Sequence, residues 1–345
     1  MAPTAGGFRE RLRPAPTDGG FRMDDYWIWG ASVVPGPDGD YHMFASRWSK
    51  GVTFSPGWTS NSHVVRATAP TPEGPFEFAE EVIPPGEEGD WDRMSHNPSV
   101  AEHDGTYLLY YYGCSYEGPR PTPEDPHGVE RTGKAVGLAT ADHPAGPWEK
   151  HGPVVPGETN AVPVVHDDGR VLLYVRDGDF EMSVYEADHW DEQYERVGKH
   201  VLSPLEDHAV WYSEATEQYE LVAKDMHHHH EDAGFVDSYA GFHATSSEGV
   251  EWTVSDPPEA YPQRTTGDRE LVVEWDDGTA DTFANVERAQ VLVEDGEATH
   301  LYLAVHEHSA EDKAEAETPA DLPSHASWPT DTYNICVPLD PPGES

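Results

Sequence analysis

The sequence predicts an all-β fold, a five-bladed β-propeller, and two observations carry this prediction. The first is a hairpin pattern that recurs five times, in which a short strand-like run, a turn and a second apolar run follow one another. Several of these turns read Asp-Gly, a strong hairpin signal because Gly accepts the positive φ that tight turns require. The second is the spacing, since the turn glycines Gly39, Gly105 and Gly169 lie 66 and 64 residues apart. Self-similarity at such a period, with several strands in each unit, indicates propeller blades.

The five hairpins follow one another along the chain. The clearest joins residues 97–101 to residues 107–112 across Asp104-Gly105. Its counterparts begin near Gly30, Asn160, Asp207 and Arg288. A third strand follows two of them and ends in Gly74-Pro75-Phe76 or Gly146-Pro147-Trp148. With about four strands in each blade, these units account for five blades.

The domain organisation follows from this repeat. Residues 1–20, rich in Gly, Pro, Arg and Ala, are expected to be loosely ordered. Residues 21–340 are expected to form a single propeller domain, with blades at about 21–82, 91–156, 157–203, 204–263 and 285–340. A closed propeller must join its ends, so a strand near Phe21 is expected to complete the fifth blade and leave no exposed edge.

The composition is strongly acidic, with 65 Asp and Glu against 21 Lys and Arg and a net charge of −44. Such a chain repels nucleic acid and anionic membranes, so neither is expected as a partner. An acidic surface of this kind is typical of halophilic proteins, because molar salt screens charges within about 3 Å. We therefore expect a protein adapted to a cytoplasm of high ionic strength.

The cysteine content and the lengths of the apolar segments also indicate a cytoplasmic location. Cys114 and Cys336 are too few for a disulfide framework and are expected to be small core residues. The first 20 residues lack the apolar region of a secretory signal, and no apolar stretch approaches the length of a membrane span. We expect a soluble, cytoplasmic protein.

The candidate site lies where the innermost strands begin, because in a propeller these strands surround a central channel. The starts carry polar pairs, namely His96-Asn97, Thr159-Asn160, Glu206-Asp207 and Glu287-Arg288, while Asp24 and Asp25 precede the first start at Gly30. Buried polar groups are costly unless they are paired or hydrated. Carboxylates and amides around a pocket, with Trp27, Trp29, Trp91 and Trp211 nearby, suit a sugar substrate.

We assign roles on this basis. The predicted catalytic residues are Asp25, Asp207 and Glu287, with Glu287 as the general acid and Asp207 or Asp25 activating water or tuning the acid. The predicted substrate-binding residues are Asp24, Trp29, Arg47, Asp92, His96, Asn97, Asn160, Glu206 and Arg288.

Each assignment has a structural alternative. Glu206-Asp207 can bond neighbouring backbone amides, and Glu287-Arg288 can form an ion pair between blades. Asp24 and Asp25 can face solvent, His96 can bond a loop, and Arg47 can pack between blades. The run His227 to His230 has metal-ligand chemistry but no fixed spacing, so we expect a solvated loop and neither a metal nor a cofactor.

At these residues the sequence resembles the five-bladed propeller glycoside hydrolases of family 43 and its clan relatives, families 32, 68 and 117. The resemblance covers almost the whole chain and rests on residues 97–110, the two Gly-Pro-aromatic motifs, Glu206-Asp207 and Glu287-Arg288. Residues 41–48 are similar to a sucrase-like subgroup. The resemblance implies hydrolysis of a glycosidic bond in an oligosaccharide or glycoside, often with inversion, in an axial pocket.

The chain departs from the family pattern in blade 1. The family places a base Asp at the start of the first inner strand, where this chain has Trp29 and Gly30. Asp24, Asp25 or another blade would have to supply the base, and the use of His as the acid by some relatives keeps His96 a candidate. The alternative function is a carbohydrate-binding propeller without catalysis.

Overall fold

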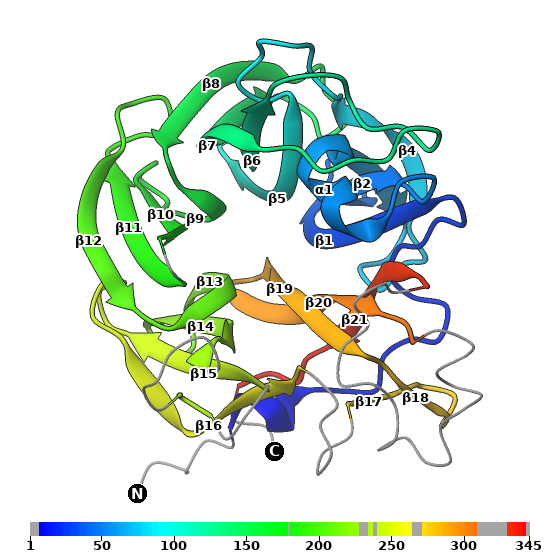
Figure 1. Ribbon diagram of the computed structural model, residues 1–345. Coiled ribbons are helices and arrows are strands. Elements are labelled where there is room, and N and C mark those ends of the chain that lie inside the picture. Colours follow the sequence, from blue (N-terminus) through cyan, green and yellow to red (C-terminus); the bar gives the residue numbers. More distant parts are fainter. Residues whose placement is uncertain are drawn as a thin grey trace, which may run out of the picture.

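The computed structural model describes residues 7–178, 180–227, 234–236, 240–263, 271–308 and 330–342. These residues form a β-propeller with one short α-helix, seen along its axis in Figure 1. In chain order the elements are η1 (Phe8–Arg11), β1 (Tyr26–Pro35), β2 (Tyr41–Ser49), α1 (Phe54–Asn61), β3 (His63–Ala69), β4 (Glu77–Ile83), β5 (Met94–His103), β6 (Thr106–Tyr116), β7 (Arg131–Ala141), β8 (Glu149–Pro156), β9 (Thr159–Val165), β10 (Val171–Asp177), β11 (Glu181–Ala187), β12 (Glu195–Leu202), β13 (Leu205–Ser213), β14 (Gln218–Asp225), β15 (Ala240–Ser246), β16 (Thr253–Pro262), β17 (Val272–Glu274), β18 (Ala280–Thr282), β19 (Asn285–Glu294), β20 (Glu297–His306) and β21 (Thr332–Pro338). No helix within the described residues is long and apolar enough to cross a membrane.

Five antiparallel sheets form the blades. Four of them have four strands, β1–β4, β5–β8, β9–β12 and β13–β16, and the fifth contains β19–β21. The inner strands β1, β5, β9, β13 and β19 contact one another in that order around the axis, and β19 contacts β1 to close the ring. The prediction of an all-β, five-bladed propeller is confirmed.

The hydrophobic core lies between the blades. Since each blade is covered by a neighbour on both faces, its middle strands are buried on both sides and are continuously apolar. Residues 171–175 of β10 and residues 107–114 of β6 are buried without a break. The outermost strands, such as β4 and β8, are mainly exposed and polar.

The N-terminal segment closes the ring, as the sequence predicted for the region near Phe21. Phe21 N donates to Asn334 O at 2.9 Å, and Asn334 N donates to Phe21 O at 3.0 Å, so the segment pairs with β21. Residues 7–20 are more ordered than the composition suggested, because Arg13 and Ala15 bond the backbones of residues 338 and 274 and Phe8 is buried against Trp211.

The two mouths of the propeller differ in their loops. We call the mouth where the inner strands begin the upper mouth and the opposite one the lower mouth. Short turns join inner to second strands at the lower mouth, whereas the longer connections 50–62, 117–130, 226–239 and 307–331 begin and end at the upper mouth. Binding residues are commonly found on loops that a rigid scaffold holds in place. The upper mouth, which has the longer loops, is therefore the candidate functional surface.

Candidate active site

Each inner strand carries the same bulge near its start. The register with the second strand shifts in all five blades, and at each of these shifts one residue has a φ between 50° and 58°. We call these five residues the axial ring: Gly30, Asn97, Asn160, Asp207 and Arg288. Gly, Asn and Asp tolerate this left-handed conformation best, which explains four of the five identities. The five strand starts are therefore equivalent, as the sequence predicted, because each contains the same backbone bulge.

The side chains of the axial ring form a chain of hydrogen bonds around the axis. Asn97 Nδ2 donates to Asn160 Oδ1 at 2.8 Å, and Asn160 Nδ2 donates to Asp207 Oδ1 at 3.3 Å. Arg288 N donates to Asp207 Oδ2 at 3.3 Å. A Cβ at Gly30 would lie 2.9 Å from Arg288 Cγ, so the absence of a side chain in blade 1 makes room for the arginine.

Burial dominates the protonation of Asp207. Desolvation, followed by the charge of Glu206, raises the pKa of Asp207 to about 6, although Lys224 and Arg288 oppose the shift. The nearest guanidinium nitrogen of Arg288 lies 3.9 Å from Asp207 Oδ1, which is too long for a strong charge-assisted hydrogen bond. Asp207 therefore changes charge near pH 6.

Beside the ring, a group of charges lies at the upper mouth. Glu206 forms an ion pair with Arg176, and Lys224 Nζ lies 3.5 Å from Glu206 Oε2 and 3.0 Å from Glu287 Oε2. These two carboxylate oxygens are therefore at most about 6.5 Å apart. Burial would lower the pKa of Lys224, but the charges of Glu287, Glu206 and Asp207 raise it, so Lys224 stays charged.

Aromatic side chains surround the same mouth. The Trp29 ring lies 5.5 Å from that of Phe54 and 4.9 Å from that of His306. The Trp58 ring lies 5.2 Å from that of His96. Phe54 and Trp58 both belong to α1, so this helix brings aromatic faces of the kind that pack on sugar rings to the upper mouth.

His96 is a neutral histidine in this surrounding. Its Nδ1 lies 2.8 Å from Ser62 Oγ, and burial, followed by the charges of Arg288 and Arg131, lowers the pKa of His96 well below its ordinary value. A neutral imidazole suits a hydrogen-bonding role and opposes the use of His96 as a general acid.

The structure does not bring Asp24 and Asp25 into the axial ring. Both are exposed in the turn before β1, where the Asp25 carbonyl accepts a hydrogen bond from Lys50 N. Asp25 lies five positions before Gly30, which corresponds to about 16 Å of extended chain. Blade 1 therefore contributes Trp29 and, at Gly30, the room that Arg288 occupies.

Arg47 and Asp92 also lie away from the axis. Arg47 packs between the rings of Tyr26 and Phe78 and pairs with Glu81 at 2.6 Å, within blade 1. Asp92 is buried and accepts hydrogen bonds from Tyr111 Oη at 2.8 Å and Lys150 Nζ at 2.6 Å. Both make the packing contacts of a structural residue.

Sequence reasoning missed Lys224, Arg176 and Trp58. Lys224 and Arg176 could have been found from the sequence. In a hairpin, the end of the second strand lies beside the start of the inner strand, so residues at that end also face the mouth. In the observed register Glu206 faces Lys224 and Thr159 faces Arg176. Trp58 lies in a connection without strand periodicity, so no pattern pointed to it.

One group in blade 3 has metal-ligand chemistry. Potential ligand atoms of Asp177, Glu181 and His200 lie within 4.8 Å of one another. Arg196 Nη1 lies 3.5 Å from Asp177 Oδ2 and already supplies a positive charge. Of the predicted histidine run, His227 contacts Asp225, and residues 228–233 lie outside the described residues.

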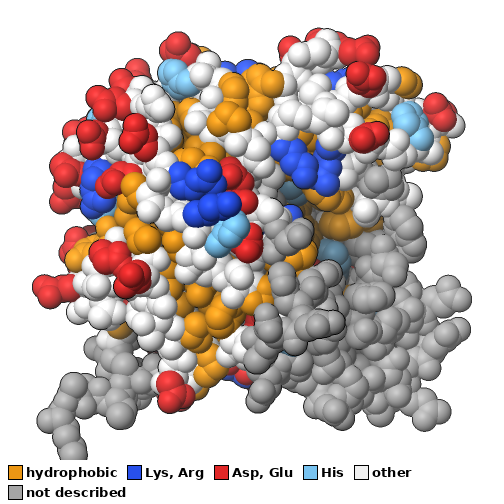
Figure 2. Space-filling view, turned by 60° about the vertical axis from the view of Figure 1, so that its left-hand side comes forward, with side chains coloured by type: hydrophobic (Ala, Val, Ile, Leu, Met, Phe, Trp, Pro, Cys, Tyr) orange, Lys and Arg blue, Asp and Glu red, His pale blue; other side chains and the backbone are white. Residues whose placement is uncertain are grey.

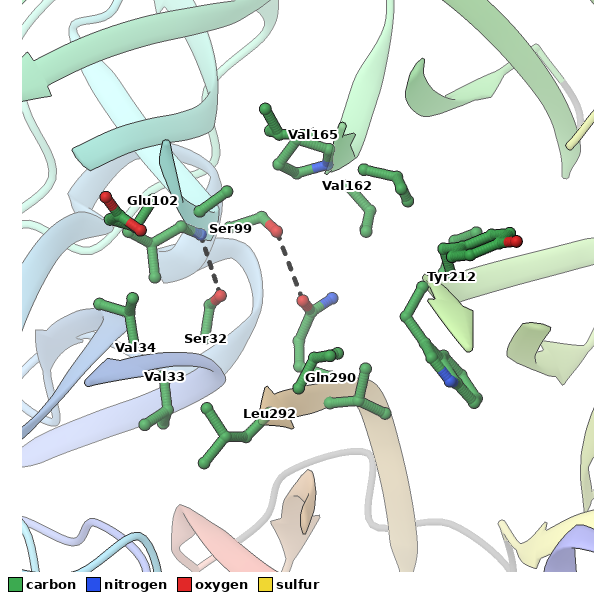
Figure 3. A pocket seen from close by; sticks show the side chains of 18 of the residues that line it. Ser32, Val33, Val34, Ser99, Glu102, Val162, Val165, Tyr212, Gln290 and Leu292 are labelled. Carbon is green, nitrogen blue, oxygen red and sulfur yellow. Dashed lines mark hydrogen bonds between the residues drawn. The ribbon is translucent and has the colours of Figure 1, made fainter. Parts of the chain in front are cut away.

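The lower mouth holds a cavity of about 870 Å³ with a different character (Figure 3). Its walls are mainly aliphatic, and Val33, Val34, Val162, Val165 and Leu292 surround the polar residues Ser32, Ser99 and Gln290. Its carboxylates lie at or beside the hairpin turns of the rim: Glu102, Asp167, Asp168 and Glu214. Glu206, Asp207 and Glu287 lie instead at the upper mouth.

Comparisons with known proteins agree with this architecture. No protein-family model matches the chain, and no curated protein sequence does. Among solved structures, a family 117 glycoside hydrolase of the marine bacterium Zobellia galactanivorans is 12% identical, with a TM-score of 0.62 over 96% of this chain and 90% of that one. A GH43_1 enzyme from Xanthomonas citri is 12% identical, with a TM-score of 0.54 over 98% and 90%. The catalytic domain of a GH62 α-L-arabinofuranosidase from Coprinopsis cinerea is 11% identical, with a TM-score of 0.52 over 97% and 98%. At these identities the likeness establishes the fold, a five-bladed propeller shared with glycoside hydrolases.

Proposed function

We propose that this chain is a glycoside hydrolase whose active site is the upper mouth. The observation that carries the proposal is the grouping of Glu206, Asp207 and Glu287, from two neighbouring inner strands, beside the ammonium of Lys224. A carboxyl group whose pKa is raised by burial and by a neighbouring carboxylate is typical of a proton donor in catalysis. The fold shared with glycoside hydrolases and the aromatic faces of Trp29 and Trp58 support a sugar as substrate.

The surroundings favour Asp207 as the proton donor. The raised pKa of Asp207, about 6, keeps part of this carboxyl protonated at mildly acidic pH. Glu287 lies 3.0 Å from the buried ammonium of Lys224 and is its ion-pair partner. This assignment reverses the one drawn from the sequence, where Glu287 was the acid.

The spacing of the carboxylates bears on stereochemistry. Inverting glycosidases hold their carboxyl groups about 6.5–9.5 Å apart and retaining ones about 5–5.5 Å apart. Glu206 and Glu287, with oxygens at most about 6.5 Å apart, fall at or below the lower end of the inverting range. NMR of the first anomer released would distinguish inversion from retention.

A specific observation favours a second candidate, a sugar-binding propeller without catalysis. Blade 1 places Gly30 in the axial ring, and its carboxylates Asp24 and Asp25 lie in an exposed turn. A site without this third carboxylate can still hold a sugar through hydrogen bonds and aromatic faces.

A screen of aryl glycosides and unmodified oligosaccharides in molar potassium chloride tests the proposal. Glu287→Gln and Asp207→Asn should each lower kcat at least about a hundredfold while remaining folded, because one positioned acid or base contributes about 10²–10⁴-fold. Glu186→Gln, which alters an outer ion pair with Arg170, is the matched control and should retain turnover. Sugar binding without hydrolysis across the screen would support the binding propeller instead.

A further inference from the structure

Three basic residues gather at the upper mouth, where blade 2 meets blade 3. Arg131 is the first residue of β7, Lys134 lies three residues further along the same strand, and Arg176 lies near the end of β10. They are close enough to repel, since burial and then the charges of Arg131 and Arg176 lower the pKa of Lys134. The backbone carbonyl of Lys134 accepts a hydrogen bond from Gly157 N at 2.7 Å, just before β9, so the group sits at the blade junction.

Neutral groups hold Arg131 in place. Its Nη1 donates to Tyr112 Oη at 3.0 Å, and its guanidinium carbon lies 4.5 Å from the centre of the Trp58 ring. The same Trp58 ring packs beside His96. Within the described part of the chain, Arg131 forms no ion pair, so its charge is not neutralised by a carboxylate.

Arg176 and Lys134 have few carboxylate partners. Arg176 pairs with Glu206, which also lies 3.5 Å from Lys224, while Lys224 has Glu287 as a second partner at 3.0 Å. Lys134 forms no ion pair with any residue that the structure describes. Neighbouring Asp177 already lies 3.5 Å from Arg196 and 3.4 Å from His200.

This excess of positive charge is the opposite of the chain as a whole, which has 65 acidic and 21 basic residues. Figure 2 shows one face of this acidic surface, where Asp and Glu side chains are scattered widely and Lys and Arg side chains are fewer. In a cleft, charges of one sign attract ligands of the other. Arginine in particular matches the planar carboxylate with two parallel hydrogen bonds.

We propose that the upper mouth binds a sugar that carries a carboxylate, with Arg131 and Lys134 as the residues that select it. The proposal rests on the proposed function only in placing the sugar at this mouth. The two cations would hold the acidic group of the sugar, and Trp58 would keep Arg131 in place through its ring face. Arg176 remains paired with Glu206 and orients that carboxylate.

Equilibrium binding in molar potassium chloride tests this, because at that salt concentration only direct contacts between charges persist. Tryptophan fluorescence would follow titrations with D-galacturonate and D-glucuronate against D-galactose and D-glucose. The uronates should bind at least about tenfold more tightly than the neutral sugars. Arg131→Gln and Lys134→Gln should each remove most of that preference, and Lys199→Gln, an exposed lysine on the outermost strand of blade 3, should keep it.

Equal binding of neutral and acidic sugars, or no binding of uronates, would overturn the inference. A preference for uronates that remains in both Arg131→Gln and Lys134→Gln would also overturn it. The same holds if Lys199→Gln removes the preference as fully as those two substitutions do. The readout needs no turnover, so uronate binding without hydrolysis would count against the hydrolase alone. Hydrolysis of neutral glycosides without a uronate preference would count against this inference alone.

Discussion

Replacing Asp207 by Asn should change how the stability of the protein depends on pH. Burial raises the pKa of Asp207 from 3.8 to about 6. Each unit corresponds to about 1.4 kcal/mol, so ionising this group in the folded protein costs about 3 kcal/mol in full. A carboxyl whose pKa is raised by folding stabilises the protein at low pH and loses that contribution as pH rises through 6. Between pH 5 and pH 8, linkage gives a loss of about 1.4 kcal/mol.

Denaturant unfolding of both proteins in molar potassium chloride at pH 5 and pH 8 measures this. The quantity of interest is the free energy of unfolding of the original protein minus that of Asp207→Asn, which should fall by about 1.4 kcal/mol. Titrating groups whose pKa does not depend on Asp207 cancel in the difference, and one of them is His208, whose pKa burial lowers to about 3. A difference that stays constant or increases with pH would mean that Arg288 keeps Asp207 ionised in the fold, and the reasoning on burial would be refuted.

Two further predictions concern stability. The net charge of −44 should make the melting temperature rise between low salt and molar potassium chloride, and an unchanged midpoint in a salt series would contradict the expected role of the acidic residues. Phe8→Ala should lower the free energy of unfolding by about 3 kcal/mol or more, because this ring is 3% exposed and packs against Trp211. The matched control Phe78→Ala, at a ring 41% exposed, should cost under about 1 kcal/mol. Equal losses would show that the segment around Phe8 does not stabilise the closed ring.

The blades were predictable because hairpin turns and apolar runs are local in sequence. Asp104 and Gly105, for example, both adopt positive φ in the structure, as the turn signal predicts. The axial ring was also within reach, since the same bulge recurs near the start of every inner strand. Once the blades are aligned, the ring positions of Asn97, Asn160 and Asp207 follow.

The contents of the upper mouth were less predictable because they depend on contacts between strands. The choice of Asp25 assumed that a nearby carboxylate could replace one in the ring, but about 16 Å of extended chain separates it from Gly30. The starts of the inner strands alone do not reveal Lys224. It lies at the end of a second strand, which in a hairpin is beside the start of the first. Trp58 depends on the path of a connection, which no periodicity specifies.

The pairing of charges at the upper mouth decides which variants can separate catalysis from folding. Lys224 is buried, and a buried cation that loses all of its partners destabilises a protein by several kcal/mol, about 3–5 in measured cases. Glu287→Gln leaves Glu206 within 3.5 Å of the ammonium, and Glu206→Gln leaves Glu287 at 3.0 Å. Each single variant therefore retains one negative partner and should fold, whereas the double variant leaves Lys224 unpaired by these two residues. Loss of turnover in the single variants thus reports on chemistry, and loss of turnover in the double variant would report on folding as well.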